Sequence, residues 1–183
     1  MNVLVACEYS GRVRDAFTKK GHFAVSCDFL MSEQPGNHVV ADVLDLLNMP
    51  GQWDMLLSFP PCTYLASSGA RWWAGKKQEQ LNALAFVYQL LHAKIDKIAL
   101  ENPIGRISTA IRKPDQIVQP WQFGHGETKS TCLWLKGLPL LQPSKIVSGR
   151  EPRIHMLPPT SDRGKLRSLT YQGIADAMAD QWG

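Results

Sequence analysis

Short apolar segments alternate with helical ones over residues 1–100 of the chain. The apolar segments have the length of buried strands, and each ends at a polar residue or a turn. They lie at 2–6, 23–27, 38–41, 53–58 and 96–100. Strands that alternate with helices predict a mostly parallel sheet, with right-handed crossovers and with helices on both faces.

Apolar residues at helical spacing predict three helices, over about 11–20, 76–93 and 172–182. Gly21 ends the first of them, as glycine commonly does. A further strand is expected at 130–135, whereas 106–125 and 139–165 show little periodicity and are expected to be irregular. The second helix carries five apolar residues on one face, namely Leu81, Leu84, Ala85, Tyr88 and Leu91.

The length and composition fit one globular domain that spans residues 1–183. No apolar run approaches the roughly 20 residues of a membrane span, and no signal sequence opens the chain. Four cysteines without C-x-x-C spacing and five dispersed histidines indicate free thiols and no metal site. These features are typical of a cytoplasmic protein without a membrane partner, and they leave the oligomeric state open.

Five polar residues lie just past the ends of the expected strands: Glu8, Asp28, Asp42, Cys62 and Glu101. In parallel α/β sheets, ligands bind beyond the carboxyl ends of the strands. The expected fold therefore brings these five side chains to one rim of the sheet.

Two of these residues carry chemistry that suits a pyrimidine. A thiolate from Cys62 would add to C6 of the ring, and a carboxylic acid from Glu101 would protonate or hydrogen-bond N3, which makes C5 a nucleophile. Each motif alone has a simpler interpretation, because a lone cysteine is commonly a buried apolar residue and Glu-Asn-Pro is a common turn. The pair, 39 residues apart and each after its own strand, favours catalysis.

Acidic residues after the second and third expected strands indicate an adenosine cofactor. Asp28 lies 17 residues after Gly11, at the position where Rossmann-like sheets bind ribose hydroxyls. Asp42 is placed to accept a hydrogen bond from the adenine amino group. The turn after the first strand has a single glycine and the chain has no phosphate-binding loop, so S-adenosylmethionine fits better than a dinucleotide.

Pro-Pro-Cys at 60–62 and Glu-Asn-Pro at 101–103 resemble the PPC and ENV motifs of the DNA cytosine-5 methyltransferases. The resemblance follows the order of that family's motifs along essentially the whole chain. It implies a Rossmann-like, S-adenosylmethionine-dependent methyltransferase fold, with Cys62 as the nucleophile and Glu101 as the activating acid. It also implies a set of cofactor-binding residues, which are Glu8, Tyr9, Ser10, Gly11, Asp28, Asp42, Pro60, Gly173 and Ala175.

Two parts of that family's pattern are missing. Lys129 alone occupies the place of the arginine-rich eighth motif, and 136–171 is too short for a target-recognition domain. The chain is therefore similar to the small catalytic cores that phages and prophages encode in bacterial hosts. Contacts with the substrate or with DNA phosphates would then come from Asn102, Lys129, Arg150, Arg153, Arg163, Lys165 and Arg167, and the net charge of +4 permits this.

Three functions are compatible with these residues. The first is methylation at C5 of cytosine in DNA, either duplex or single-stranded. The second is C5 alkylation of a free pyrimidine nucleotide, or transfer of a modified alkyl group. The third is a phage nucleic-acid-binding module without catalysis, which the atypical first turn would explain.

Overall fold

A computed structural model describes residues 1–49 and 52–183, apart from the side chains of Trp72 and His155. Its strands are β1 (Asn2–Ala6), β2 (Phe23–Asp28), β3 (His38–Val40), β4 (Met55–Ser58), β5 (Lys97–Pro103), β6 (Gln116–Val118) and β7 (Thr131–Lys136). Its α-helices are α1 (Arg12–Lys19), α2 (Val43–Leu47), α3 (Lys77–Leu91), α4 (Ile107–Ala110), α5 (Arg153–Met156), α6 (Arg163–Ser168) and α7 (Gln172–Trp182). Two 3-10 helices are η1 (Ser67–Trp72) and η2 (Pro120–Gln122).

The seven strands form one sheet in the order β3-β2-β1-β4-β5-β7-β6. The first five strands in this order are parallel, whereas β7 runs antiparallel to β5, and β6 runs antiparallel to β7. This is a mixed α/β, Rossmann-like fold, so the predicted fold class is confirmed. The chain turns back between β3 and β4, which places the topological switch between β1 and β4.

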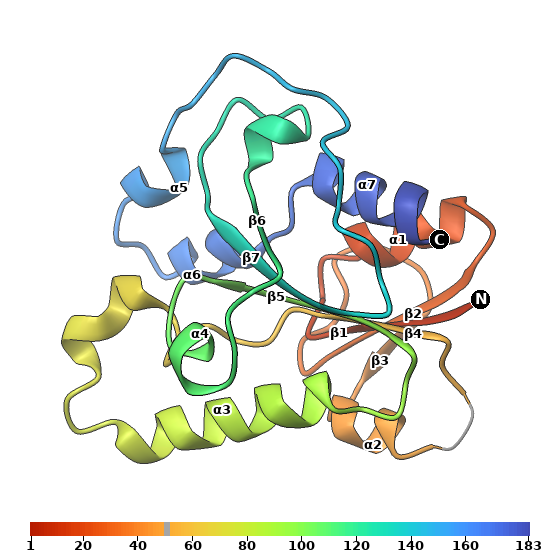
Figure 1. The fold of residues 1–183 in the computed structure, drawn as a ribbon, viewed down its shortest axis with the longest axis horizontal. Helices are drawn as coiled ribbons and strands as arrows, with labels where there is room; N and C mark the ends of the chain where they lie inside the picture. The colour runs from red at the N-terminus through yellow and green to blue at the C-terminus, as the bar shows by residue number, and fades with distance from the viewer. Residues whose placement is uncertain (50–51) are drawn as a thin grey trace.

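Helices cover both faces of the sheet, as Figure 1 shows, with α1 and α7 on one face and α2, α3 and α4 on the other. Two apolar cores result. The first joins the sheet to Phe17 of α1 and to Met178 and Trp182 of α7. The second joins it to Leu46 of α2 and Leu90 of α3. Burial of both sheet faces explains why the parallel strands are almost continuously apolar.

The end of β5 differs from the prediction, which placed Glu101 just past a strand. Pairing of β5 with β4 ends at Leu100, opposite Ser58. Pairing with β7 continues to Pro103. Glu101 and Asn102 therefore lie inside a strand, but beyond the end of its parallel neighbour. Antiparallel pairing with a strand much later in the chain leaves no local signal, which is why the sequence missed this extension.

The face of α3 that meets the core also differs from the prediction. The buried residues of this helix are Val87, Leu90 and Leu91. Leu81 and Tyr88 are instead more than half exposed. Apolar residues occur all round α3, so spacing alone did not identify the buried side. Short elements inside stretches expected to be irregular, such as β6 and α6, were not predicted either.

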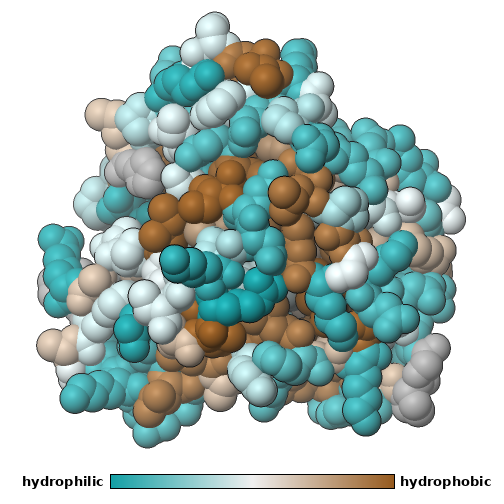
Figure 2. All heavy atoms as spheres, in the orientation of Figure 1, coloured by the Kyte–Doolittle hydropathy of each residue, from teal (hydrophilic) through white to brown (hydrophobic). Residues whose placement is uncertain are grey.

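Figure 2 shows an apolar band across the middle of the face on which β6 and β7 lie, with hydrophilic residues around it. Ile117 on the edge strand β6 is about half exposed. In the described part of the chain, no helix combines the length and the apolar character needed to cross a membrane.

Candidate active site at the carboxyl ends of the strands

The turn after β1 has an unusual backbone. Cys7 has φ 58°, although it is not a glycine, and Gly11 has φ 77°. The amide of Cys7 donates to the carbonyl of Cys27 at 2.7 Å, which holds the turn against the end of β2. A Cβ on Gly11 would lie 2.5 Å from Nη2 of Arg14, so both the conformation and the space require glycine there.

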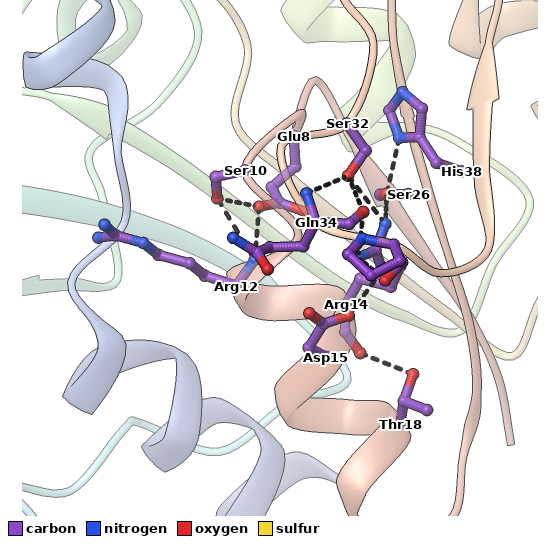
Figure 3. A network of polar contacts seen from close by, with 11 residues as sticks. Glu8, Ser10, Arg12, Arg14, Asp15, Thr18, Ser26, Ser32, Gln34 and His38 are labelled. Atoms are coloured by element: carbon purple, nitrogen blue, oxygen red, sulfur yellow. Dashed lines mark hydrogen bonds and ion pairs between the residues drawn. The ribbon is translucent and has the colours of Figure 1, made fainter.

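Glu8 is a buried carboxylate in this turn, with 5% of its surface exposed. Its Oε1 accepts from the Ser10 hydroxyl and from the backbone amide of Arg12, as Figure 3 shows. Its Oε2 is buried and has no partner. Burial raises the pKa of Glu8 above its usual value. A ligand with a cationic nitrogen would meet both needs of this group, because it would hydrogen-bond Oε2 and balance the charge.

Tyr9 contacts the α6 segment. Its ring is almost fully buried, and its hydroxyl donates to the carbonyl of Lys165 at 3.2 Å. The same hydroxyl lies 3.2 Å from the hydroxyl of Ser168. The side chain of Tyr9 therefore joins the first turn to α6.

Asp28 and Asp42 lie at the ends of the neighbouring strands β2 and β3. Oδ1 of Asp28 accepts from the amide of Leu30 at 3.0 Å. Oδ1 of Asp42 accepts from the amide of Leu44 at 3.0 Å and caps the N-terminus of α2. Each carboxylate keeps Oδ2 for another donor, so both remain able to bind a ligand.

Three exposed apolar residues directly follow Asp28, and the sequence analysis missed them. Phe29, Leu30 and Met31 are 74%, 55% and 77% exposed. Large apolar side chains beside a strand-end carboxylate offer a flat surface to an adenine ring. The signal was present in the sequence, because three apolar residues in a row at a strand end are not explained by turn chemistry.

The loop after β4 carries the predicted nucleophile. The amide of Phe59 donates to the carbonyl of Ala6 at 3.0 Å, which ties the start of the loop to the end of β1. Nδ2 of Asn102 donates to the carbonyl of Pro60 at 2.8 Å. Asn102 is 1% exposed, so this is a buried bond between β5 and the loop. The structure thereby brings the Cys62 loop and the Glu101 strand together.

Neighbouring charges act on Cys62 and Glu101. The protein around the Cys62 thiol raises its pKa by desolvation, and Glu101 raises it further. Lys129 and Arg167 act in the opposite direction on that thiol. Burial raises the pKa of Glu101, and Lys129 lowers it. For Cys62, desolvation and Glu101 outweigh the two cations, so the pKa of the thiol lies above its ordinary value.

Glu101 and Lys129 line a small cavity. Its volume is about 10 Å³, which is the room that one water molecule needs. The other lining residues come from β7, from the loop after β4, from the segment that leads into α7 and from α7 itself: Phe59, Thr131, Thr170, Tyr171, Ile174 and Met178. A cavity of this volume is too small for a pyrimidine ring.

The cations expected to hold DNA have different surroundings. The guanidinium of Arg150 lies 3.8 Å from the ring centre of Trp121. Arg153 pairs with Glu151 at 2.7 Å, and Lys165 pairs with Glu33 at 2.8 Å.

Nζ of Lys129 donates to the carbonyl of Arg167 at 2.9 Å. Arg163, the first residue of α6, also interacts with a neighbouring group. Of this set, Lys129 and Arg167 are the cations that act on Cys62.

The predicted cofactor residues of α7 are packed against protein. Ala175 has no exposed surface and belongs to the core beside α1. A Cβ on Gly173 would lie 1.9 Å from the carbonyl of Phe123, and its amide donates to Nε2 of His125 at 3.0 Å. In this structure both Gly173 and Ala175 therefore pack against protein, and their predicted contact with a cofactor stays a prediction.

No model of a protein family matches the chain, and no curated protein matches it. Among the solved structures, the chain is similar to a crystal structure described as that of a candidate DNA modification methyltransferase encoded within a prophage (E. coli), with a TM-score of 0.51 and 13% sequence identity. The similarity covers 80% of this chain and 52% of that one, so the chain spans about half the length of the protein that it matches. At this identity the likeness establishes the shared α/β fold.

Proposed function

We propose that this chain is an S-adenosylmethionine-dependent methyltransferase that acts at C5 of cytosine in DNA. The observation that supports this most strongly is the buried bond from Asn102 to Pro60, because it joins the Cys62 loop to the strand of Glu101. The similar fold of a protein described as a DNA modification methyltransferase supports the same class of reaction.

The residues at the ends of β1 and β2 fit S-adenosylmethionine. The buried, unpartnered Oε2 of Glu8 suits the cationic amino group of its methionine part. Asp28 suits the ribose hydroxyls, and the exposed ring of Phe29 suits the adenine. Asp42 would accept from the adenine amino group through the oxygen that does not cap α2. Once bound, this cofactor supplies an electrophilic methyl group.

Cys62 and Glu101 would activate the ring. The Cys62 thiolate forms a bond to C6, and the electron pair of the C5–C6 double bond moves to C5. A proton from Glu101 to N3 neutralises the charge that develops on the ring, and its raised pKa keeps that proton available. C5 would then take the methyl group that the cofactor supplies. Loss of the C5 proton to a base, for which water suffices, would re-form the C5–C6 double bond and expel the Cys62 thiolate, and N3 would return its proton to Glu101.

Cations from two segments would hold the substrate near the thiol. Lys129 on the approach to β7 and Arg167 on α6 both act on Cys62, so a phosphate held by them would lie near the thiol. A cytosine in duplex DNA must leave the base stack, at a cost of a few kcal/mol. Single-stranded DNA avoids this cost and is the preferred form of substrate in this proposal.

A free pyrimidine nucleotide is the second candidate substrate. The observation that favours it is that Arg150, Arg153 and Lys165 have partners within the protein. A phosphate would have to compete with those partners, whereas a single nucleotide needs only Lys129 and Arg167.

The test is transfer of label from tritiated S-adenosylmethionine to duplex DNA, single-stranded DNA and dCMP in separate reactions. Label in 5-methylcytosine after digestion of the DNA supports the first candidate. Label in dCMP alone supports the second. Absence of label from all three substrates would contradict the proposed reaction.

A further inference from the structure

Arg14 is a buried cation beside the turn that follows β1, with 1% of its surface exposed. All five of its N–H donors are used. Nε donates to the Asp15 carboxylate at 2.8 Å, and Nη1 donates to the hydroxyls of Ser26 at 3.2 Å and Ser32 at 3.1 Å. Nη2 donates to the carbonyls of Gln34 at 3.2 Å and Pro35 at 3.1 Å. Figure 3 shows this network between α1, β2 and the β2–β3 loop, residues 29–37.

A chain of hydrogen bonds, here called the relay, connects Arg14 through Ser26 and His38 to the start of the same loop. Oγ of Ser26 lies 2.8 Å from Nδ1 of His38, and Nε2 of His38 lies 2.9 Å from the carbonyl of Leu30. The carbonyl can only accept, so Nε2 carries a proton, and in the neutral imidazole Nδ1 accepts from the Ser26 hydroxyl. Arg14, Ser26 and His38 thus donate in one direction, toward Leu30.

Leu30 is also the residue whose amide binds Asp28, at 3.0 Å. The loop is therefore held at its start through the relay and at its far end through Gln34 and Pro35. Between these points lie Phe29 and Met31, whose side chains are exposed.

We propose that Arg14 is a positioning residue for the adenosine part of the cofactor, because it fixes the β2–β3 loop that presents Asp28 and Phe29. This inference rests on the proposed function. Arg14 touches neither the cofactor nor the reacting atoms; it acts through the loop.

The surroundings of Arg14 show that the chain is adapted to this side chain. A Cβ on Gly36, which has φ 145°, would lie 2.8 Å from Cζ of Arg14, and a Cβ on Gly11 would lie 2.5 Å from Nη2. Both glycines leave the space that the guanidinium occupies. A buried cation stabilises a fold poorly compared with an apolar residue of similar volume, whereas its planar fork fixes several acceptors at once. Fixing a loop explains an arginine here better than stability does.

The experiment measures the affinity of the full chain for S-adenosylhomocysteine by calorimetry. Arg14→Lys keeps the charge but has three donors on a flexible stem, so it cannot hold this set of acceptors. We expect the Kd to rise by about tenfold, since bonds from a charged donor are lost. Arg112→Lys is the matched control, because Arg112 also pairs with an acid, Asp115 at 2.8 Å, and with a carbonyl, that of Leu135 at 3.0 Å. It should change the Kd by less than about twofold.

A double-mutant cycle with Asp28→Ala separates positioning from a general loss of structure. If Arg14 acts by placing Asp28, Arg14→Lys should weaken binding at least about threefold less in the Asp28→Ala background than in wild type. Effects that simply multiply would overturn the inference. Ser32→Ala leaves Arg14 in place and removes the three hydrogen bonds of the Ser32 hydroxyl, one with Arg14 and two with the backbone of Gln34. It should raise the Kd about threefold even if Arg14→Lys does not fold.

The possible failures are distinguishable. Equal affinities of wild type and both loop variants would overturn the role of Arg14 alone. Absence of binding by the wild-type chain would overturn the proposed function together with this inference.

Discussion

At the scale of single residues, Cys62 and Glu101 depend on each other through their charges. An ionised Glu101 raises the pKa of the thiol, and a protonated Glu101 does not. A Glu101 that keeps its proton until the S–C6 bond forms would not oppose ionisation of the thiol. The same proton would then be available to N3 as negative charge develops on the ring.

The pH dependence of the reaction follows from these two groups. The reactive form combines an ionised Cys62 with a protonated Glu101. Its population rises with pH below the pKa of Glu101, is level between the two pKa values, and falls above that of Cys62. The pKa of Glu101 is raised from 4.5 and that of Cys62 from 9.0. The two bends of the pH profile should therefore lie above these ordinary values.

Lys129 lowers both pKa values, so Lys129→Met should move both limbs to higher pH. The rate of adduct formation with 5-fluorocytosine DNA, measured over a range of pH, tests this. A shift of either limb to lower pH would contradict the assignment.

Asn102 is expected to hold the Cys62 loop in place. Asn102→Ala leaves the carbonyl of Pro60 without its buried donor, so the free energy of unfolding should fall by about 1–3 kcal/mol and adduct formation should slow. Ser67→Ala is the control, because its bond to the carbonyl of Ile104 is exposed and worth about 0.5 kcal/mol. Urea denaturation with equal losses in both variants would argue against a special role for Asn102.

At the scale of the elements, the sequence predicted the parts of the fold whose signals are local. The buried strands β1 and β2 and the helix α7 have continuous or periodic apolar residues, and their predicted bounds agree closely with the structure. The extension of β5 past Glu101 depends on β7, and the buried side of α3 depends on what packs against it. The local sequence pattern predicts neither of these features.

The entry into α7 gives a prediction at this scale. Gly173→Ala would place a methyl group 1.9 Å from the carbonyl of Phe123, so α7 must shift, at a cost of about 1–3 kcal/mol in the free energy of unfolding. Gly164→Ala in α6 is the matched control, since a Cβ there has nothing within 4 Å and alanine favours a helix by about 0.5–1 kcal/mol. Thermal denaturation of the two variants should therefore shift in opposite directions. A fall in both midpoints would contradict this account.

At the scale of the whole molecule, the rim of the sheet was predictable from strand ends, whereas the partners of the side chains at the rim were not. The positions of Glu8, Asp28 and Cys62 followed from topology. Lys165 pairs with Glu33, and Arg14 donates to the carbonyl of Gln34 in the β2–β3 loop. No short motif connects the residues of either pair in the sequence.

The different surroundings of the cations predict how DNA binding responds to salt. Arg167→Ala should reduce the slope of the logarithm of affinity against the logarithm of salt concentration by about one unit. Arg150→Ala should leave it unchanged, because Arg150 stacks on Trp121 and donates to the carbonyl of Gly149 at 2.7 Å. Filter binding at several salt concentrations measures both. Identical slopes for wild type and Arg167→Ala would favour the free nucleotide as substrate.

The most direct test of the central claim is a covalent adduct. Fluorine at C5 cannot leave as a proton does, so an enzyme that adds Cys62 to C6 and methylates C5 stays bound to DNA that contains 5-fluorocytosine. With S-adenosylmethionine present, mass spectrometry of the digested complex should locate the DNA on Cys62, and Cys62→Ser should abolish the adduct while Cys132→Ser retains it. An adduct at Cys132, or none with a protein that binds both DNA and cofactor, would contradict the account.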